Sequence, residues 1–291
     1  MTAADTRRFL AEEIRVTANI RSPRLIDAIA TIPRDRFLPP GPWLIRGVAD
    51  MGGGPRQTDD ADPRHVHHDV AVAIDPARDL YNGQPSLIAG WLEAAGVAEG
   101  QRVIHIGCGT GYFTAWIAHV VGPAGSVHAM DVDPDLASRA RANLADRPWV
   151  TVVQGNGTTA LPPGADVVIV HAGATHVLDV WLDTLNDGGR LLLPLTMAAP
   201  GMPANIGKGP MLLVTRHGAE WRARCFSIVA IYSLKDARDE TLGAELAKML
   251  MSGAWMRVTR LRRDAHERGD TCVLHGRTTC LSGDAAKEMG Q

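Results

Sequence analysis

The 291-residue chain lacks the features that mark membrane, secreted and metal-stapled proteins. No run approaches the ~18 apolar residues of a membrane-spanning helix, and the first residues carry no apolar stretch of a secretory signal. No two of its four cysteines form a C-x-x-C pair, which argues against a zinc ribbon and against a dithiol redox motif. We therefore expect a cytoplasmic protein with reduced, buried thiols and no bound metal.

Net charge is also low, and the chain has no internal repeat or low-complexity tract. Thirty basic and 32 acidic residues give a formal net charge of -2, so we expect neither nucleic acid nor a membrane surface as a partner. Hydrophobic residues make up 45% and charged residues 21%, the composition of an ordinary globular protein. A chain of this length buries roughly 75% of its unfolded surface, so its core needs no metal or disulfide.

Short apolar runs alternate with helical patterns from residue 86 onward. The expected helices cover residues 86–95, 112–121, 134–145 and 177–185. The expected strands cover residues 102–106, 126–130, 150–153, 166–170 and 190–195. Because successive strands separated by helices pair in parallel, this pattern predicts an α/β fold with a doubly wound, mostly parallel sheet.

The flanking regions have other patterns. The first forty residues look helical, with Ser22 as a cap and Pro23 as a first helical residue, and residues 39–66 look like a long loop containing Met51-Gly52-Gly53-Gly54-Pro55. Beyond the parallel strands we expect an antiparallel strand pair formed by residues 210–216 and 223–232. A helix over residues 241–251 and a hairpin of residues 270–275 and 278–281 should follow. The chain is therefore predicted to have three parts. Residues 1–80 form N-terminal helices with a substrate-side loop, residues 81–235 form a central domain, and residues 236–291 form a C-terminal appendage.

A glycine-rich turn follows the first parallel strand. The segment Ile106-Gly107-Cys108-Gly109-Thr110-Gly111-Tyr112 leads from a strand into a helix. Glycine is needed where the backbone takes positive φ or approaches a ligand closely, and a helix start offers unpaired N–H groups. Dinucleotide sites have the longer spacing G-x-G-x-x-G. The tighter G-x-G-x-G is more typical of S-adenosylmethionine sites, and a plain glycine turn is the alternative.

Polar residues end the next two strands. Asp131 follows the second strand, where a carboxylate can accept the hydroxyls of a ribose. Its alternative role as a helix cap is already filled by Asp133 before Pro134. Asn156 lies between two glycines after the third strand, where its amide can bind an adenine edge or form an Asn-Gly turn. Together the three strand ends favour binding of S-adenosylmethionine.

Five segments of the chain resemble the protein-L-isoaspartate O-methyltransferase family in order and spacing. They are Ile32-Pro33-Arg34-Asp35-Arg36-Phe37-Leu38-Pro39, Gly83-Gln84-Pro85, and residues 106–112, 150–157 and 187–194. The resemblance covers about residues 8–232 and implies a class I methyltransferase fold with a Rossmann-like, seven-stranded sheet. It also implies S-adenosyl-L-methionine as cofactor and transfer of its methyl group to a carboxylate of damaged aspartate in peptides.

The resemblance further implies roles for individual residues. The cofactor would be held by Gly107, Gly109, Gly111, Asp131 and Asn156, with their neighbours His105, Tyr112, Val132 and Gly157. Gln84 and His171 would face the acceptor, and they are the predicted catalytic residues.

Four residues depart from the family pattern. Gly83 stands where the family usually has a serine or threonine whose hydroxyl lies at the reaction centre. His105 replaces an acidic residue, Asn156 replaces an aspartate, and His171 replaces a small residue. Three functions stay open: methylation of a peptide or protein carboxylate, tailoring of a natural-product peptide or small molecule, and cofactor binding without catalysis.

The histidines bear on the reaction. A carboxylate acceptor is ionised at neutral pH and needs no general base, whereas a hydroxyl or amine would favour one. His171, His176 and His68 are then the candidates, each with a structural role as the alternative. The segment from His65 to Asp69 looks metal-like, but it lies in a polar loop without a fourth ligand. The sequence leaves open whether the chain forms a homo-oligomer.

Overall fold

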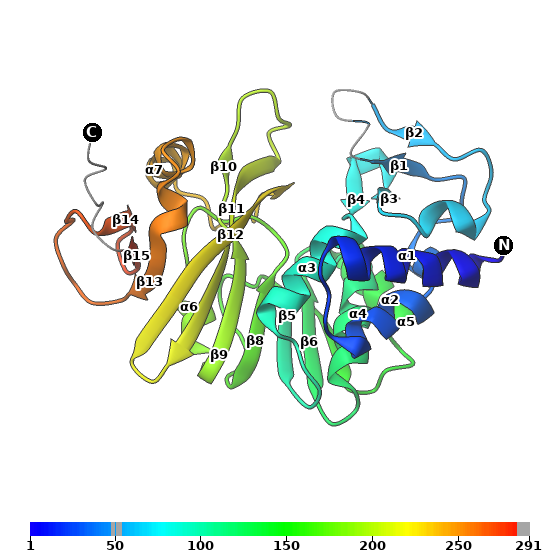
Figure 1. Cartoon of the computed structure of the whole chain (residues 1–291), viewed down its shortest axis with the longest axis horizontal. Helices are drawn as coiled ribbons and strands as arrows, with labels where there is room; N and C mark the ends of the chain where they lie inside the picture. The colour runs from blue at the N-terminus through cyan, green and yellow to red at the C-terminus, as the bar shows by residue number, and fades with distance from the viewer. Residues whose placement is uncertain (48–49, 51–53, 284–291) are drawn as a thin grey trace. The chain divides into compact units, whose positions relative to one another are not determined.

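The computed structural model of the chain describes residues 1–47, 50 and 54–283 (Figure 1). It divides into two compact units. The first unit comprises Met1–Arg102 and Cys108–Gly155, and the second comprises Val103–Gly107 and the chain from Asn156 onward. The expected boundaries after residues 80 and 235 do not coincide with this division, and they stay a prediction about functional parts.

The first unit begins with three helical segments: α1 (Ala3–Thr17), α2 (Pro23–Thr31) and the 3-10 helix η1 (Arg34–Phe37). The Ser22 hydroxyl accepts the N–H of Leu25, so the predicted cap at the start of α2 is confirmed. The buried side of α2 carries Leu25, Ala28 and Ile29. These apolar side chains explain why a helix of only nine residues is stable, since tertiary packing supplies most helical stability.

A small antiparallel sheet follows, in the order β2-β1-β3-β4. Its strands and short helices are β1 (Leu44–Arg46), β2 (Arg56–Gln57), η3 (Pro63–Val66), β3 (Ala71–Asp75), η4 (Pro76–Arg78) and β4 (Leu80–Asn82). The expectation of a continuous loop over residues 39–66 is therefore wrong, because Trp43 and Ile45 pack with Val66 and Val72 in a buried cluster. Met51, Gly52 and Gly53 of that expected loop lie outside the described residues.

The rest of the first unit matches the predicted pattern closely. It contains α3 (Pro85–Ala95), α4 (Tyr112–Val121), β6 (Ser126–Asp131), α5 (Pro134–Asn143) and β7 (Val150–Gln154). The strands β6 and β7 pair in parallel, as the alternation with helices predicted. Almost every residue of α4 is buried, in accord with its lack of charged side chains.

The second unit is built on a sheet in the order β14-β15-β13-β12-β11-β9-β8-β5. Its parallel strands are β5 (Arg102–Ile106), β8 (Ala165–Val170) and β9 (Leu185–Pro194). The antiparallel pair β11 (Ile206–His217) and β12 (Glu220–Tyr232) is confirmed with its turn at Gly218, and β10 (Met197–Ala198) pairs with β11.

The helix expected over residues 177–185 is shorter, because only α6 (Asp179–Asp183) forms. The Thr184 carbonyl accepts the N–H groups of Gly164 and Ala165, and Leu185 pairs with Ala165. Strand β9 therefore begins at Leu185 rather than at residue 190, and it includes the glycines at 188 and 189. These bonds join residues about 20 positions apart, so local helical spacing could not indicate them.

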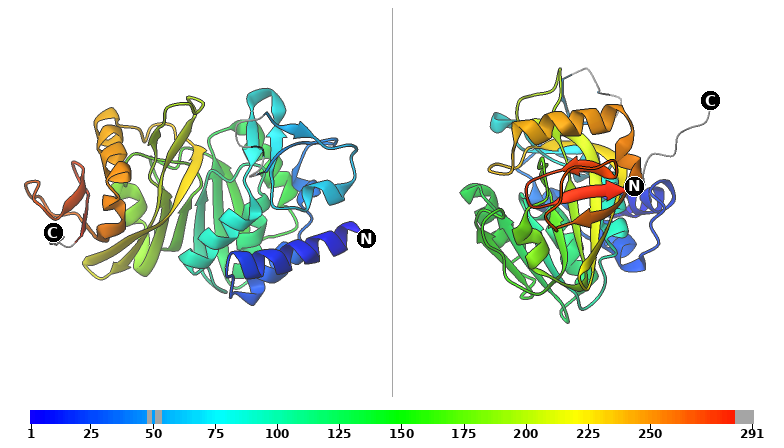
Figure 2. Two further views of the ribbon diagram at one scale, coloured as in Figure 1. Left: turned by 45° about the horizontal axis from the view of Figure 1, so that its top comes forward. Right: turned by 90° about the vertical axis from the view of Figure 1, so that its left-hand side faces the viewer.

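The C-terminal segment continues the sheet of the second unit. It contains α7 (Glu240–Met251), η5 (Ala254–Arg257), β13 (Val258–Arg262), β14 (Cys272–His275) and β15 (Cys280–Gly283). The predicted helix and hairpin are confirmed, and α7 lies beside β14 (Figure 2). Because β13 pairs with β12 and β15 pairs with β13, this unit alone has more strands than the seven expected.

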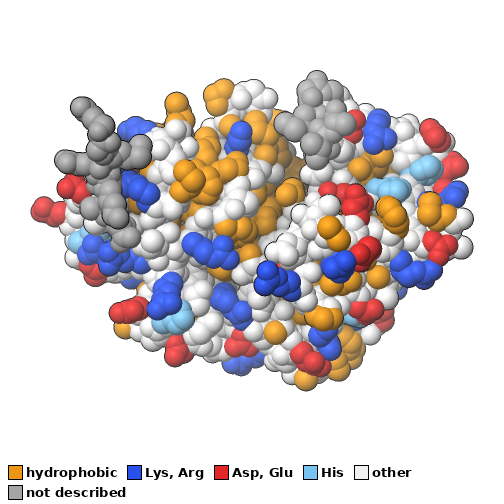
Figure 3. Space-filling model, in the orientation of Figure 1, with side chains coloured by type: hydrophobic (Ala, Val, Ile, Leu, Met, Phe, Trp, Pro, Cys, Tyr) orange, Lys and Arg blue, Asp and Glu red, His pale blue; other side chains and the backbone are white. Residues whose placement is uncertain are grey.

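None of the described helices combines the length and apolar composition needed to cross a bilayer. On the face drawn in Figure 3, basic and acidic side chains are interspersed, as the formal net charge of -2 leads one to expect.

Arg34 organises the first unit from a fully buried position. Its two terminal nitrogens donate to the carbonyls of Val70 and Gly83 at 2.8 Å and to the side chain of Asn82 at 2.9 Å. Burial lowers the pKa of Arg34 to about 10, so the guanidinium remains charged at neutral pH. It therefore fixes the chain immediately before Gln84.

Replacement of Arg34 by methionine leaves these buried acceptors without a donor, and we expect a loss of roughly 3 kcal/mol or more in unfolding free energy. Urea denaturation followed by circular dichroism measures the change. The matched control is Arg36→Met in the same 3-10 helix, since Arg36 is half exposed and its ion pair with Asp146 is long, at 3.9 Å. Equal stability losses in the two variants would contradict the proposed role of Arg34.

Candidate active site

The glycine-rich turn adopts the backbone conformation that its sequence predicted. Gly107, Gly109 and Gly111 have φ angles of 80°, 56° and 92°, all in the left-handed region. Gly111 caps α4, and a Cβ atom there would lie 2.9 Å from Cδ1 of Leu144. The chain passes from the second unit to the first between Gly107 and Cys108.

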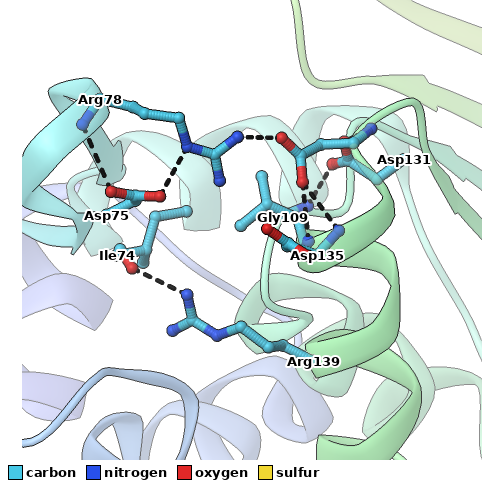
Figure 4. Close-up of polar contacts among 9 residues, drawn as sticks. Ile74, Asp75, Arg78, Gly109, Asp131, Asp135 and Arg139 are labelled. Carbon is cyan, nitrogen blue, oxygen red and sulfur yellow. Dashed lines mark hydrogen bonds and ion pairs between the residues drawn. The ribbon is translucent and has the colours of Figure 1, made fainter.

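In the first unit, Asp131 holds the turn from the end of β6 (Figure 4). Its carboxylate accepts the N–H of Gly109 at 2.8 Å and the N–H of Asp133 at 3.1 Å. Asp131 is 9% exposed, and burial raises its pKa although both N–H groups oppose the shift. A carboxylate has about four acceptor positions, and these two hydrogen bonds occupy two of them.

A network of ion pairs and hydrogen bonds lies beside Asp131 (Figure 4). The Arg78 guanidinium donates to Asp75 at 2.6 Å and also pairs with Asp133, the residue that caps α5. Arg139 donates to the carbonyl of Ile74 at 2.9 Å. The network ties η4 and the end of β3 to α5, so it fixes the chain that follows Asp131. Sequence reasoning could not find this network, because Arg78 and Asp133 are 55 positions apart in the chain.

The other predicted cofactor residues of the first unit differ in exposure. Val132 is 54% exposed, so its side chain is accessible next to Asp131. The Tyr112 ring is buried against Phe37 and Trp116, and burial raises its pKa to about 12. The side chain of Tyr112 is therefore part of the core, and its backbone begins α4. The buried hydroxyl of Thr110 has no hydrogen-bond partner among the described residues.

Gln84 caps α3 through its backbone position, and its amide donates to the carbonyl of Asp69 at 3.3 Å. The Asp69 carboxylate in turn accepts the N–H and the hydroxyl of Ser86 at 2.7 and 2.6 Å. A Cβ atom on Gly83 would meet only Ile88 and Phe113, at 3.7 to 3.9 Å. Position 83 therefore has room for a Cβ atom, and packing at that atom does not require its glycine.

In the second unit, Gly157 permits a close approach to β5. A Cβ atom there would lie 2.5 Å from Cγ2 of Ile106, and the Gly157 carbonyl accepts the indole N–H of Trp181 at 2.8 Å. Asn156 donates its amide to Asp236 at 3.1 Å and accepts the Thr158 hydroxyl at 2.7 Å. Its side chain thus stabilises the turn that follows β7, its contact with adenine stays a prediction, and Asp236 is a partner that sequence reasoning missed.

His105 and His171 form a pair in the second unit. Nε2 of His105 lies 3.3 Å from Nδ1 of His171, and the backbone N–H of His171 donates to Ile106 at 2.8 Å. Burial, reinforced by His171, holds the pKa of His105 well below its usual value, and burial lowers the pKa of His171 to about 4. Both imidazoles are therefore neutral at pH 7, and one ring donates to the other.

Among the other histidines of the sequence analysis, His176, His67 and His65 have side-chain or hydroxyl partners. Nδ1 of His176 lies 2.9 Å from the Thr175 hydroxyl. His67 is 1% exposed and lies 3.2 Å from the Asp35 carboxylate, and His65 pairs with Asp60. Burial lowers the pKa of the half-buried His68. Within the described residues, the segment from His65 to Asp69 is not among the groups whose ligand atoms converge.

Comparison with known proteins places these features in a family. The family model described as Protein-L-isoaspartate(D-aspartate) O-methyltransferase matches residues 58–204. The chain is 33% identical over 181 residues to the protein-L-isoaspartate O-methyltransferase of Anaeromyxobacter dehalogenans, covering 60% of this chain and 75% of that protein. It is 29% identical over 196 residues to the enzyme of that name from Ignicoccus hospitalis, covering 66% and 82%.

Two solved structures share the fold. One is a protein-L-isoaspartate O-methyltransferase with a TM-score of 0.62 and 22% identity, covering 84% of this chain and 69% of the other. The second is a putative enzyme of the same kind from Plasmodium falciparum, in complex with S-adenosyl-L-homocysteine, with a TM-score of 0.59, 15% identity and coverages of 79% and 98%. The predicted class I methyltransferase fold is confirmed.

The two neutral imidazoles make stability depend on pH. An unfolded histidine binds a proton below about pH 6.5, whereas folded His171 binds one only near pH 4. The unfolding free energy therefore falls as the pH drops from about 6.5 to 4, by at most roughly 1.4 kcal/mol per pH unit for each group. Urea unfolding at several pH values should give a shallower slope for His171→Gln than for the parent chain. Replacement of the exposed His217 by glutamine is the control, and an unchanged slope for His171→Gln would refute the assignment.

Proposed function

Because the chain belongs to the protein-L-isoaspartate O-methyltransferase family, we propose that it methylates a carboxylate of a peptide or protein, with S-adenosyl-L-methionine as the donor. The observation that carries this proposal is the buried Asp131 carboxylate, hydrogen-bonded to Gly109 with acceptor positions to spare. A ribose presents two neighbouring hydroxyl donors, which match such a carboxylate.

The residues of the first unit fit the cofactor. Gly109 and Gly111 keep Cβ atoms away from the turn, Asp131 offers acceptors, and the exposed Val132 offers an apolar surface. Contacts from Tyr112, and from His105, Gly107, Asn156 and Gly157 of the second unit, stay predictions. When bound, S-adenosyl-L-methionine supplies a methyl group on a positively charged sulfur.

The state of His171 supports a carboxylate acceptor. With a pKa of about 4, His171 is a weak proton acceptor, poorly matched to a hydroxyl or amine that must lose a proton. A carboxylate is already ionised at neutral pH and requires only orientation, which can contribute roughly 7–11 kcal/mol to catalysis. We assign Gln84 and His171 to positioning of this acceptor, as the family resemblance implies.

Gly83 favours a second candidate within the same reaction. The family usually places a hydroxyl at this position, and here the hydroxyl is missing although a Cβ atom would fit. The acceptor would then differ from a damaged protein, as in tailoring of a natural-product peptide or a small carboxylic acid. A cytoplasmic location and a homo-oligomeric state stay predictions of the same proposal.

The test is mass spectrometry of reactions with the full chain, S-adenosyl-L-methionine and a panel of acceptors. The panel pairs isoaspartyl peptides with the same peptides carrying normal aspartate, and adds small carboxylic acids. A base-labile ester formed on isoaspartate supports the first candidate, and ester on other acceptors only supports the second. Failure on every acceptor, by the parent chain and by Gly83→Ser, together with cofactor binding, would support the non-catalytic alternative instead.

Asp131→Asn should weaken binding of S-adenosyl-L-methionine roughly 10- to 100-fold, because the amide keeps the shape of the side chain but loses the charge and one acceptor. Isothermal titration calorimetry measures the dissociation constant. Asp135→Asn is the matched control, since Asp135 is exposed on the first turn of α5. Unchanged affinity in the Asp131 variant would remove the central support for this cofactor site.

A further inference from the structure

Four side chains of the C-terminal segment bring metal-binding atoms together. One nitrogen or sulfur atom from each of His266, Cys272, His275 and Cys280 lies within 4.8 Å of the others. Among the residues that the structure describes, no other group of three or more histidine, cysteine or acidic side chains brings its ligand atoms this close together. All four belong to the second unit and lie beyond residue 204, where the match to the family model ends.

The hairpin of β14 and β15 explains how they converge. His275 and Cys280 are direct partners across the strands, so their side chains lie on one face. Cys272 and His275 are three residues apart, a spacing that puts side chains on opposite faces of a regular strand. The register shift between Cys272 and Leu274 cancels this alternation and pairs Cys272 with Ser282. Since Ser282 and Cys280 share a face, Cys272 joins them.

His266 reaches the group from the segment between β13 and β14. Its Nδ1 lies 2.8 Å from the carbonyl of Asp264, and its Nε2 lies 3.6 Å from Sγ of Cys272. A histidine that donates Nδ1–H to a carbonyl keeps Nε2 free of a proton, which is the usual arrangement of a metal-bound imidazole. The Asp264 carbonyl thus orients this ring toward the sulfur.

Two further atoms point to a ligand. Nδ1 of His275 is buried and has no hydrogen-bond partner among the residues that the structure describes, and its ring lies edge-on to that of His266 with centroids 4.8 Å apart. A buried polar atom without a partner is costly, and a bound ion would satisfy it. The N–H of Gly269 lies 3.4 Å from Sγ of Cys272 and is placed to stabilise a thiolate.

We propose that His266, Cys272, His275 and Cys280 bind one zinc ion. The donor set of two sulfurs and two nitrogens is typical of closed, structural zinc sites, and it excludes the oxygen-preferring Mg²⁺ and Ca²⁺. Bond lengths of about 2.0–2.3 Å in a tetrahedron separate neighbouring ligand atoms by about 3.3–3.8 Å. The four atoms therefore need to move by only about 1 Å. Binding releases the two thiol protons and leaves both sulfurs as thiolates.

The site would fasten the end of the sheet in the second unit. The connection from β13 to β14 is largely exposed. Besides the cluster, ion pairs anchor it: Arg268 pairs with Glu245 of α7 at 2.8 Å, and Arg263 pairs with two aspartates of α6 at 2.7 and 2.9 Å. An exposed ion pair contributes little to stability, whereas a structural zinc ion contributes folding free energy directly. All four zinc coordination positions are filled by protein, so the ion would take no part in methyl transfer.

The test uses the full chain, purified without a polyhistidine tag from cells grown with zinc. Mass spectrometry of metals should find about one zinc per parent chain and per Cys225→Ser control, and at least a five-fold reduction in Cys272→Ser and Cys280→Ser. Cys225 is the matched control because it lies on β12, outside the cluster. Zinc in the parent chain no higher than in the two cluster variants would overturn the proposal.

A second measurement does not depend on variants that fold. Zinc alone, added to the chelator-treated parent chain under reducing conditions, should protect two of the four thiols from alkylation and raise the melting temperature. Cobalt in its place should give the visible absorption of a tetrahedral ion bound by thiolates. The proposal would be overturned if adding zinc left the alkylation of all four thiols unchanged. A disulfide between Cys272 and Cys280 in the protein as isolated would overturn it as well.

Discussion

The hydrogen bond from the Gly109 N–H to the Asp131 carboxylate is the constraint on which the first unit's part of the site depends. A carboxylate that is 9% exposed must be hydrogen-bonded, since an isolated buried charge is very costly. Two backbone N–H groups meet this need, and one of them belongs to a turn that only glycines can form without strain. The conformation of the turn and the charge of Asp131 therefore depend on each other. Both are set by the folded chain before any ligand binds.

The regular elements could be predicted because their signals are local. β5 and α4 have the predicted bounds, since an apolar run and a capping glycine lie within a few residues of each other. The strands β1 and β2 could not be predicted, because two or three residues carry no alternation. Distant contacts hold them: β1 pairs with β2 and β3, and Ile45 of β1 packs with Val66 and Val72. The early end of α6 likewise depends on bonds to Gly164 and Ala165, about 20 residues away.

The candidate site divides in the same way. The glycines and Asp131 follow motifs within single segments, whereas the bond of Arg78 to Asp133 and that of Asn156 to Asp236 join residues 55 and 80 positions apart. His105 and His171 were singled out separately as departures from the family pattern. Their proximity follows from the parallel register that pairs Ile106 with Val170, because His171 is the next residue after that pair. What looked like two independent substitutions is one buried pair, in which neither ring can gain a proton easily because burial opposes charge on both.

The C-terminal cluster shows why a missing motif does not exclude the chemistry associated with it. The C-x-x-C pair of zinc ribbons is compact because two ligands of one turn must face one ion. A strand pair achieves the same convergence with other spacings, since cross-strand neighbours are as close as residues within a turn. Here one irregularity between Cys272 and Leu274 decides the outcome, because a regular ladder would turn Cys272 away from His275. The absence of a C-x-x-C pair thus argues only against ligands that converge within one turn. In this fold the ligand atoms converge across two paired strands, which their spacing along the chain does not reveal.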